Sequence, residues 1–181
     1  MENKTQCIKN KKINCFTLEN FENLGSINNC HLAKATFQNS KMDSIKVRHS
    51  HLTKSNLQKC NIKKASFQNT NLEKSSFAWS NLQSNQFLSD NISNVNFQFV
   101  DLSNSRLISC KAQKSDFRWS KLINCRFIDC NLKEANFSNT DLRNVIFEGC
   151  NLKGAMYNIN TRLPFTRDMA NSLGMNFVGV N

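Results

Sequence analysis

Large apolar residues recur at every fifth position over most of this chain. From Ile27 to Tyr157, none of the 27 residues at this spacing is charged, and nearly all are Leu, Phe, Ile, Met or Val. A second series, two residues earlier in each group of five, holds mainly Ala, Cys, Ser, Thr and Val. The other three positions are mostly polar. An amphipathic helix repeats every 3.6 residues and a half-buried strand every two, so neither element explains the pattern.

The five-residue unit matches a known repeat. Residues 135–139 read Ala-Asn-Phe-Ser-Asn, and residues 140–144 read Thr-Asp-Leu-Arg-Asn. These groups resemble the motif of the pentapeptide-repeat family, in which a small residue is followed by Asp or Asn, then Leu or Phe, then two variable residues. The resemblance covers roughly residues 27–157. It implies an all-β fold, a right-handed quadrilateral β-helix in which four pentapeptides make one coil.

In such a fold, residues twenty apart lie above one another at the roughly 4.8 Å spacing of neighbouring strands. Starting from Phe37, steps of twenty meet only aromatic residues as far as Tyr157, with the exception of Leu57. The same steps from Leu32 to Leu152 meet no aromatic residue. We therefore expect Phe on two opposite walls of the coil and Leu on the two walls between them.

The N-terminal segment departs from this register. Each coil of a solenoid contacts only its neighbours, so both ends need a cap. Phe16 and Phe21 are five residues apart but one residue out of step with the main series. We expect residues 1–26 to form an irregular cap or an imperfect first coil, and residues 27–158 to form the repeat domain.

The C-terminal segment, residues 159–181, has a helical pattern. Phe165, Met169 and Leu173 follow helical spacing, and Gly174 follows them as a stop signal. The pattern predicts a short helix that covers the last coil, joins two copies of the chain, or does both.

The composition limits both the turns and the cellular setting. With Gly 5 and Pro 1, the many turns of a solenoid cannot depend on the usual turn-forming residues. The chain start lacks the apolar stretch of a signal peptide, and no apolar run approaches the roughly 20 residues that cross a bilayer. We expect a cytoplasmic protein, with a secreted effector as the alternative.

The cysteines follow the repeat. Six of the eight lie within the repeat, all at positions divisible by five, namely Cys30, Cys60, Cys110, Cys125, Cys130 and Cys150. This spacing differs from that of zinc ligands and favours buried, reduced thiols over metal ligands or disulfides.

Sequence motifs of enzymes are absent. The chain has no Gly-rich phosphate loop, no nucleophile elbow and no zinc-protease motif. The three histidines are His31, His49 and His51, and the first and last are twenty apart on one outer edge. Outward polar positions are usually solvated, so we expect no catalytic residue, no metal and no cofactor.

Two ladders of outward apolar residues are candidates for partner contact. Trp79, Phe99 and Trp119 each follow an inward Phe by two residues and are twenty apart. A second outward ladder is formed by Leu88, Ile108 and Ile128. Large exposed apolar patches usually mark interaction sites, but stacked side chains also stiffen a solenoid. Both interpretations stay open.

The formal net charge of +11 is concentrated in the N-terminal part. Residues 1–64 carry +8 and residues 65–181 carry +3. The candidate basic surface comprises Lys34, Lys54, Lys74, Lys63 and Lys64. Such a surface attracts nucleic acid, phospholipid or an acidic protein, although surface lysines often serve solubility alone.

Residues 169–179 resemble the tail of Qnr-type quinolone-resistance proteins and related topoisomerase-interacting pentapeptide proteins. The resemblance implies a rod-shaped homodimer that binds DNA gyrase, a type II topoisomerase, and shields it from inhibitors. The residues expected to form the dimer contact are Phe165, Met169, Leu173, Met175 and Phe177. A charge of +11 opposes DNA mimicry along the whole rod, and only the stretch near Asp90, Asp101 and Asp116 offers a negative surface.

The sequence therefore leaves three functional hypotheses. The chain binds and protects a type II topoisomerase, it is a protein-interaction scaffold or secreted effector, or it binds an anionic partner such as nucleic acid or membrane through its basic half.

Overall fold

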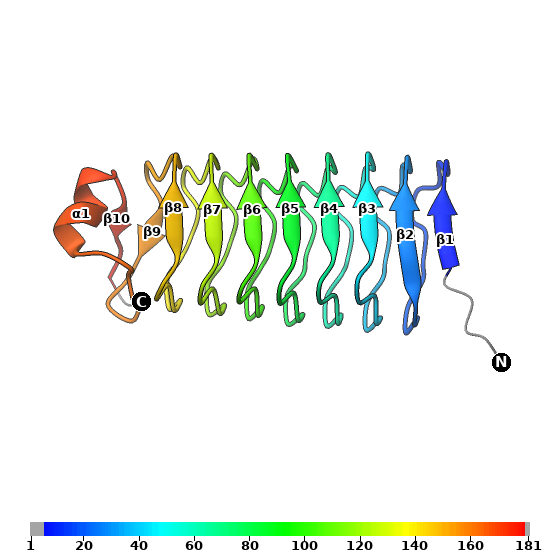
Figure 1. The fold of residues 1–181 in the computed structure, drawn as a ribbon, viewed down its shortest axis with the longest axis horizontal. Helices are drawn as coiled ribbons and strands as arrows, with labels where there is room; N and C mark the ends of the chain where they lie inside the picture. The colour runs from blue at the N-terminus through cyan, green and yellow to red at the C-terminus, as the bar shows by residue number, and fades with distance from the viewer. Residues whose placement is uncertain (1–5, 180–181) are drawn as a thin grey trace.

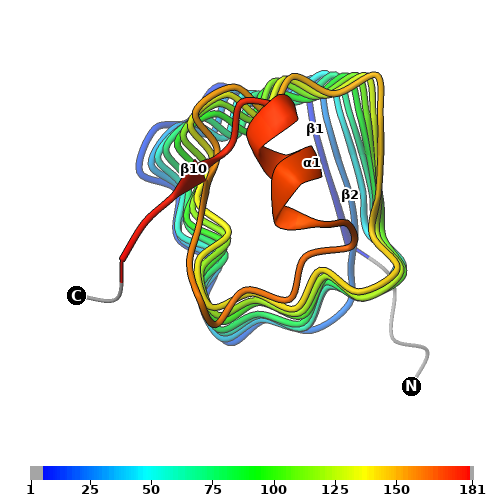
Figure 2. The ribbon, with the colours of Figure 1, turned by 90° about the vertical axis from the view of Figure 1, so that its left-hand side faces the viewer.

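The five-residue pattern winds the chain into a stack of four-sided coils (Figures 1 and 2). The computed structural model describes residues 6–179. One wall of the stack is an eight-stranded parallel sheet in sequence order. Its strands are β1 (Gln6–Lys9), β2 (Leu24–Asn28), β3 (Lys46–Arg48), β4 (Ser66–Gln68), β5 (Gln86–Leu88), β6 (Arg106–Ile108), β7 (Arg126–Ile128) and β8 (Ile146–Glu148). The quadrilateral β-helix expected from the sequence is confirmed.

The register between coils is twenty residues. Phe67 lies beside Phe87 in the sheet wall, and His31 lies beside His51 in the next wall, where the pairing consists of single bridges. Each coil therefore donates and accepts backbone hydrogen bonds along the axis of the stack, as between Leu52 and Asn71 (N to O, 2.7 Å).

Phenylalanine rings fill the interior. Phe77, Phe97 and Phe117 stack with centroids 5.4 and 5.0 Å apart and nearly parallel planes. On the opposite wall Phe67 stacks on Phe87 at 4.7 Å, and Phe67 meets Phe77 edge to face at 6.0 Å. Aromatic pairs favour both arrangements. The expectation of Phe on two opposite walls is thus confirmed.

The corners are built from residues with positive φ. From Asn29 to Asn144, every fifth residue is a non-glycine residue in the left-handed region. At many corners an N–H three residues on closes a turn, as from Ala35 to the carbonyl of Leu32 (3.1 Å). Glycine adopts this conformation most easily, but from Asn29 to Asn144 the corners use other residues, which accounts for the low glycine content.

The small inward residues connect neighbouring coils. The Ser75 hydroxyl donates to the carbonyl of Leu52 (2.6 Å), and the Ser115 hydroxyl donates to that of Ile92 (2.6 Å). Buried carbonyls need a donor, and a small side chain with a hydroxyl both fits the corner and supplies one.

Cysteines occupy the same position. The Cys60 thiol contacts the carbonyl of Phe37 (3.0 Å), and burial raises the pKa of this thiol to about 11. No cysteine of the described chain forms a disulfide, and five are buried: Cys30, Cys60, Cys110, Cys125 and Cys130. Cys150 is partly exposed, and Cys7 and Cys15 are exposed. The prediction of buried, reduced thiols is therefore confirmed for five of the six cysteines in the repeat.

At many coils an Asn or Asp before the large inward residue closes a side-chain turn. The Asn136 side chain accepts from the N–H of Ser138 (2.9 Å), and the Asp101 carboxylate accepts from the N–H of Ser103 (3.0 Å). Asx turns of this kind satisfy a backbone donor that points out of the coil.

The first coil is one residue shorter than the others. Lys12 lies beside His31, an offset of nineteen, and the register shifts between Gln6 and Cys7. Phe16 therefore falls under Ala35, at a position that holds a small residue in later coils, and packs on Phe37 (centroids 6.0 Å). Among the described residues no earlier coil packs beneath Phe16, so a large ring is accommodated at this position.

A helix closes the other end of the stack (Figure 2). α1 (Arg167–Ser172) begins at Thr166, whose side chain accepts from the N–H of Met169. After Gly174, with φ +76°, β10 (Asn176–Phe177) pairs in parallel with β9 (Met156–Tyr157) of the last coil. Within residues 6–179 no helix is long or apolar enough to span a membrane.

One carboxylate lies inside the stack. Asp90 is 1% exposed and accepts hydrogen bonds from the N–H groups of Thr70 (2.7 Å) and Leu88 (3.1 Å). Burial raises its pKa to about 7, and these two donors only partly oppose that rise. Asp90 therefore adds no fixed negative charge to the surface.

We predict that Asp90→Asn stabilises the protein at alkaline pH. An unfolded Asp loses its proton near pH 3.9, so between about pH 4 and pH 7 the folded state holds more protons than the unfolded state, and wild-type stability falls as pH rises. Asparagine keeps the oxygen that accepts from Thr70 and has no charge to bury, but its amide NH2 replaces the oxygen that accepts from Leu88, which offsets part of the gain at both pH values. Urea unfolding is expected to show a gain of up to about 4 kcal/mol at about pH 8 and a much smaller gain at about pH 5.

The surface variant Asp43→Asn serves as the control, because it makes the same change of net charge outside the core. An equal effect of Asp90→Asn at both pH values, or no gain at about pH 8, would contradict the assignment.

Candidate partner-binding surface

Trp79, Phe99 and Trp119 form one exposed stack, called here the aromatic edge. Trp79 and Phe99 have ring centroids 4.0 Å apart, and Phe99 and Trp119 are 5.1 Å apart, with planes within 8° of parallel. Their exposed fractions are 59%, 37% and 43%. The sequence prediction of a vertical outward stack is confirmed in its geometry.

All three residues of the aromatic edge have positive φ, between 57° and 65°. Asn39 and Asn139 occupy the same corner of other coils, also with positive φ. Asparagine tolerates this conformation, whereas for a bulky side chain it is uncommon. The left-handed conformation costs roughly 1–2 kcal/mol per residue, and each aromatic pair returns about 0.5–1.5 kcal/mol. Stacking alone gives the aromatic residues no clear advantage over asparagine at this corner.

An open groove of ≈ 290 Å³ runs beside the aromatic edge. Asp101 lies in it, held by a hydrogen bond from the Gln83 side chain (2.8 Å). The groove is lined by Trp79, Ser80, Asn81, Phe99, Val100, Asp101, Trp119 and Lys121. It combines aromatic surface with one acidic and one basic side chain.

A cation lies against the last ring of the aromatic edge. The Arg118 guanidinium is 5.2 Å from the centroid of Trp119 and makes a two-pronged contact with Asp116 (2.9 and 2.7 Å). Burial alone would raise the pKa of Asp116. Hydrogen bonds from Arg118 and Gln98 outweigh this and hold the pKa below its ordinary value. Asp116 is thus neutralised by Arg118, so of the three acids expected to form a negative surface only Asp101 remains as an unpaired charge.

The second apolar ladder lies elsewhere. Leu88, Ile108 and Ile128 are half-buried on the outer side of β5, β6 and β7. The corner next to Leu88 is ten residues, or half a coil, from that of Trp79. The structure therefore does not join the two ladders into one surface.

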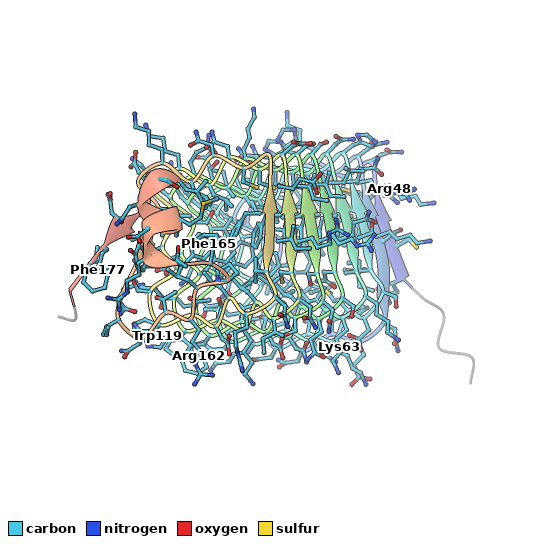
Figure 3. The ribbon with its side chains drawn as sticks, turned by 60° about the vertical axis from the view of Figure 1, so that its left-hand side comes forward. Arg48, Lys63, Trp119, Arg162, Phe165 and Phe177 are labelled. Atoms are coloured by element: carbon cyan, nitrogen blue, oxygen red, sulfur yellow. The ribbon has the colours of Figure 1, made fainter. Side chains whose placement is uncertain are left out.

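The basic candidates are also divided. Lys34, Lys54 and Lys74 have positive φ at one corner, and Lys64 has positive φ half a coil away, with Lys63 beside it. Lys74 is paired with Glu73 (3.1 Å). In Figure 3, Lys63 lies at the lower margin of the stack, whereas Arg48 projects at the right-hand end.

The five C-terminal residues expected to form the dimer contact differ in how far they are buried. Met175 is buried, and Phe165 and Leu173 pack against the core; Figure 3 shows Phe165 between α1 and the last coil. Met169 (48% exposed) and Phe177 (50% exposed) are the accessible members of this set.

Residues 6–179 contain no group of three His, Cys, Asp or Glu side chains that could hold a metal ion. His31 and His51 stack with centroids 5.4 Å apart. Lys12 lies beside His31 in the same column. The sequence did not predict this neighbour, because the offset between the first coil and the next is nineteen residues and not twenty.

Comparison with known proteins bears on the whole repeat. The family model described as pentapeptide repeats (8 copies) matches residues 30–69 and 50–84, and the model described as pentapeptide repeat region matches residues 100–161. Together these segments span well over half of the chain. A search of curated proteins finds no significant match.

Several solved structures are similar at low identity. A pentapeptide-repeat protein from Nostoc PCC 7120 is 22% identical over 54% of this chain and 84% of its own, with a TM-score of 0.39. Full-length QnrB1, a plasmid-mediated fluoroquinolone resistance protein, is 13% identical over 96% of this chain and 94% of its own, with a TM-score of 0.36. HetL from Nostoc sp. strain PCC 7120, involved in heterocyst differentiation regulation, is 17% identical over 96% and 87%, with a TM-score of 0.29.

The repeat motif, the twenty-residue register and the two family models agree, and the chain belongs to the pentapeptide-repeat family.

Proposed function

We propose that this protein is a non-enzymatic scaffold that binds a protein partner through the aromatic edge and its groove. The observation that carries the proposal is the exposure of Trp79, Phe99 and Trp119 on a left-handed backbone. Aromatic side chains, together with Arg, are enriched in the energetically dominant parts of protein interfaces.

The partner is expected to present apolar side chains to the rings and polar groups to the groove. Asp101 and Lys121 lie beside the rings and offer one charge of each sign for orientation. Three rings stacked along one corner make a narrow, rigid strip, which favours an extended segment or a ridge of the partner over a flat surface. A secreted effector that acts on a protein of another cell is one form of the same scaffold role.

We predict that Trp79→Asn with Trp119→Asn abolishes partner binding and leaves the fold intact. Asn39 and Asn139 already occupy this corner, so relief of backbone strain and loss of stacking should offset each other to within about 1 kcal/mol. The measurement is affinity capture from native lysate with quantitative comparison of the bound proteins, paired with thermal unfolding.

Leu88→Gln with Ile128→Gln is the matched control. It removes apolar side chains from the opposite corner, where Gln68 already lies in register with Leu88. The proposal fails if the asparagine variant retains every bound protein, or if both variants lose the same ones.

A second candidate function rests on the C-terminal segment. β10 pairs on one side with β9 and lies at the edge of its sheet, next to the exposed Phe177 and Met169. An unpaired strand edge with apolar side chains is suited to self-association about a two-fold axis. Together with the tail resemblance, this supports a cytoplasmic homodimer that binds a type II topoisomerase and protects it from quinolones.

The charges of the middle coils limit the ways in which this protein could contact a topoisomerase. Asp90 is buried, and Asp116 is paired with Arg118, so the middle coils lack the row of negative charges that duplex mimicry needs. Contact with the enzyme would then depend on the aromatic edge and not on resemblance to DNA.

We predict that the solution mass is about twice the monomer mass of 20.8 kDa and that Phe177→Asp returns it to the monomer value, because the charge would be buried at the contact. Light scattering after size exclusion measures this. A supercoiling assay with gyrase and ciprofloxacin tests the second step: wild-type protein should restore supercoiling and the Phe177→Asp variant should not.

Met169→Gln is expected to weaken the dimer less than Phe177→Asp, since it removes apolar surface from the same contact without adding charge. A monomeric wild-type chain rules out the dimer, and absence of rescue at micromolar protein rules out the topoisomerase role.

A further inference from the structure

An open basic pocket lies at the N-terminal end of the stack, away from the aromatic edge. Its volume is ≈ 370 Å³. It is lined by Asn10, Lys11, Lys12, Asn29, Cys30, His31, His49 and His51. Apart from the buried Cys30, every lining side chain is a cation, an imidazole or an amide.

Three coils build this pocket. Lys12, His31 and His51 are successive members of one column, paired by backbone bridges. At the adjoining corner, Asn10, Asn29 and His49 follow one another, all with positive φ. Positive φ recurs at this corner in every coil. The regular backbone of the repeat is therefore enough to bring these three side chains together.

Further cations flank the pocket. Lys9 lies in register with Asn28, and Asn28 with Arg48, so Lys9 and Arg48 belong to the column next to the corner. Lys34 lies three residues beyond His31 at the following corner. The positive groups therefore surround the pocket along both directions of the surface.

No described carboxylate balances these charges. Glu22 is paired along the backbone with Lys41 on a different wall, and the Asp43 carboxylate accepts from the Lys63 N–H and the Asn61 side chain. Within residues 6–179, Lys11 and Lys12 form no ion pair. Cations grouped without partners raise the local potential and attract an anion.

We propose that this pocket binds a condensed phosphate group, the linked phosphates of a free polyphosphate or of a nucleoside triphosphate. Several cations and imidazoles in one pocket exceed what a single phosphate requires. Lysine ammonium groups and imidazole N–H groups give charge-assisted hydrogen bonds to phosphate oxygens, and the two asparagine amides add neutral donors.

The stacking of His31 on His51 also bears on the ligand. Their planes are 28° from parallel and 5.4 Å apart, so each ring covers one face of the other. Apart from the third imidazole, His49, the pocket lining offers no further aromatic ring and no Leu, Ile, Val, Met or Phe side chain to pack against a base. The phosphates, and not a base, are therefore the recognised part.

The test is calorimetric titration of the full chain with sodium tripolyphosphate at neutral pH and low salt. Wild-type protein is expected to bind at one site, and Lys11→Gln with Lys12→Gln to weaken binding by about tenfold or more. His31→Gln with His51→Gln should weaken it about threefold to tenfold, because the imidazole donors are lost while amides remain.

Lys41→Gln with Lys64→Gln is the charge-matched control. It removes two exposed lysines from other walls of the same coils, and its affinity should equal that of the wild type. Equal weakening in this control overturns the proposal, because net charge alone would then explain binding.

Other anions separate the sources of phosphate. ATP binding with an affinity close to that of tripolyphosphate supports a nucleotide source, and binding of tripolyphosphate alone supports a free polyphosphate. Absence of tripolyphosphate binding overturns the proposal, as does binding only of duplex DNA or of vesicles of anionic phospholipid. Circular dichroism of each variant checks that the fold is kept.

Discussion

The structure depends on one geometric constraint, the constant register of twenty residues from coil to coil. Backbone hydrogen bonds along the axis require it, as do the rings of Phe77, Phe97 and Phe117, which lie in contact only when each coil repeats the last. A single residue inserted into a coil would move every later inward side chain to another position of the repeat. The departures lie at the two ends: Lys12 pairs with His31 at an offset of nineteen, and Asp141 pairs with Arg162 at an offset of twenty-one. Regularity is therefore strictest in the middle and relaxes only at the ends.

Much of this fold follows from the sequence because the pattern is redundant. Twenty-seven positions at a spacing of five follow the same rule, so a single small residue such as Ala112 does not obscure it. The details that escaped depend on contacts between coils. The bonds from Ser75 and Ser115 to carbonyls of the preceding coil have no sequence signal beyond a preference for small residues. Asp90 was expected to form negative surface, although it stands two residues before Ile92, in the inward series of small residues; burial there raises its pKa to about 7.

The candidate sites, too, could be predicted from the sequence only in part. The aromatic edge was predictable because its members are twenty residues apart on the regular part of the stack. The basic pocket was not, because Lys12 joins His31 through the offset of nineteen that holds only in the first coil. The separation of Lys64 from Lys54 by half a coil likewise needs the corners to be placed in space. Charge counted along the chain treats these lysines as one surface, whereas the coil divides them between opposite corners.

A solenoid makes such sites independent of each other and of the fold. Outward residues at one corner lie beside those twenty positions before and after, and the corners of different coils hold Asn, Lys, Ser or an aromatic residue at similar positive φ. The aromatic edge begins at Trp79, while the pocket ends at His51, on other walls and in earlier coils. Since coupling between substitutions is small when the sites share no contacts, changes at one surface should add to changes at the other. Physical separation along one rigid axis thus allows a single chain to hold two ligands at once, with the distance between them set by the number of intervening coils.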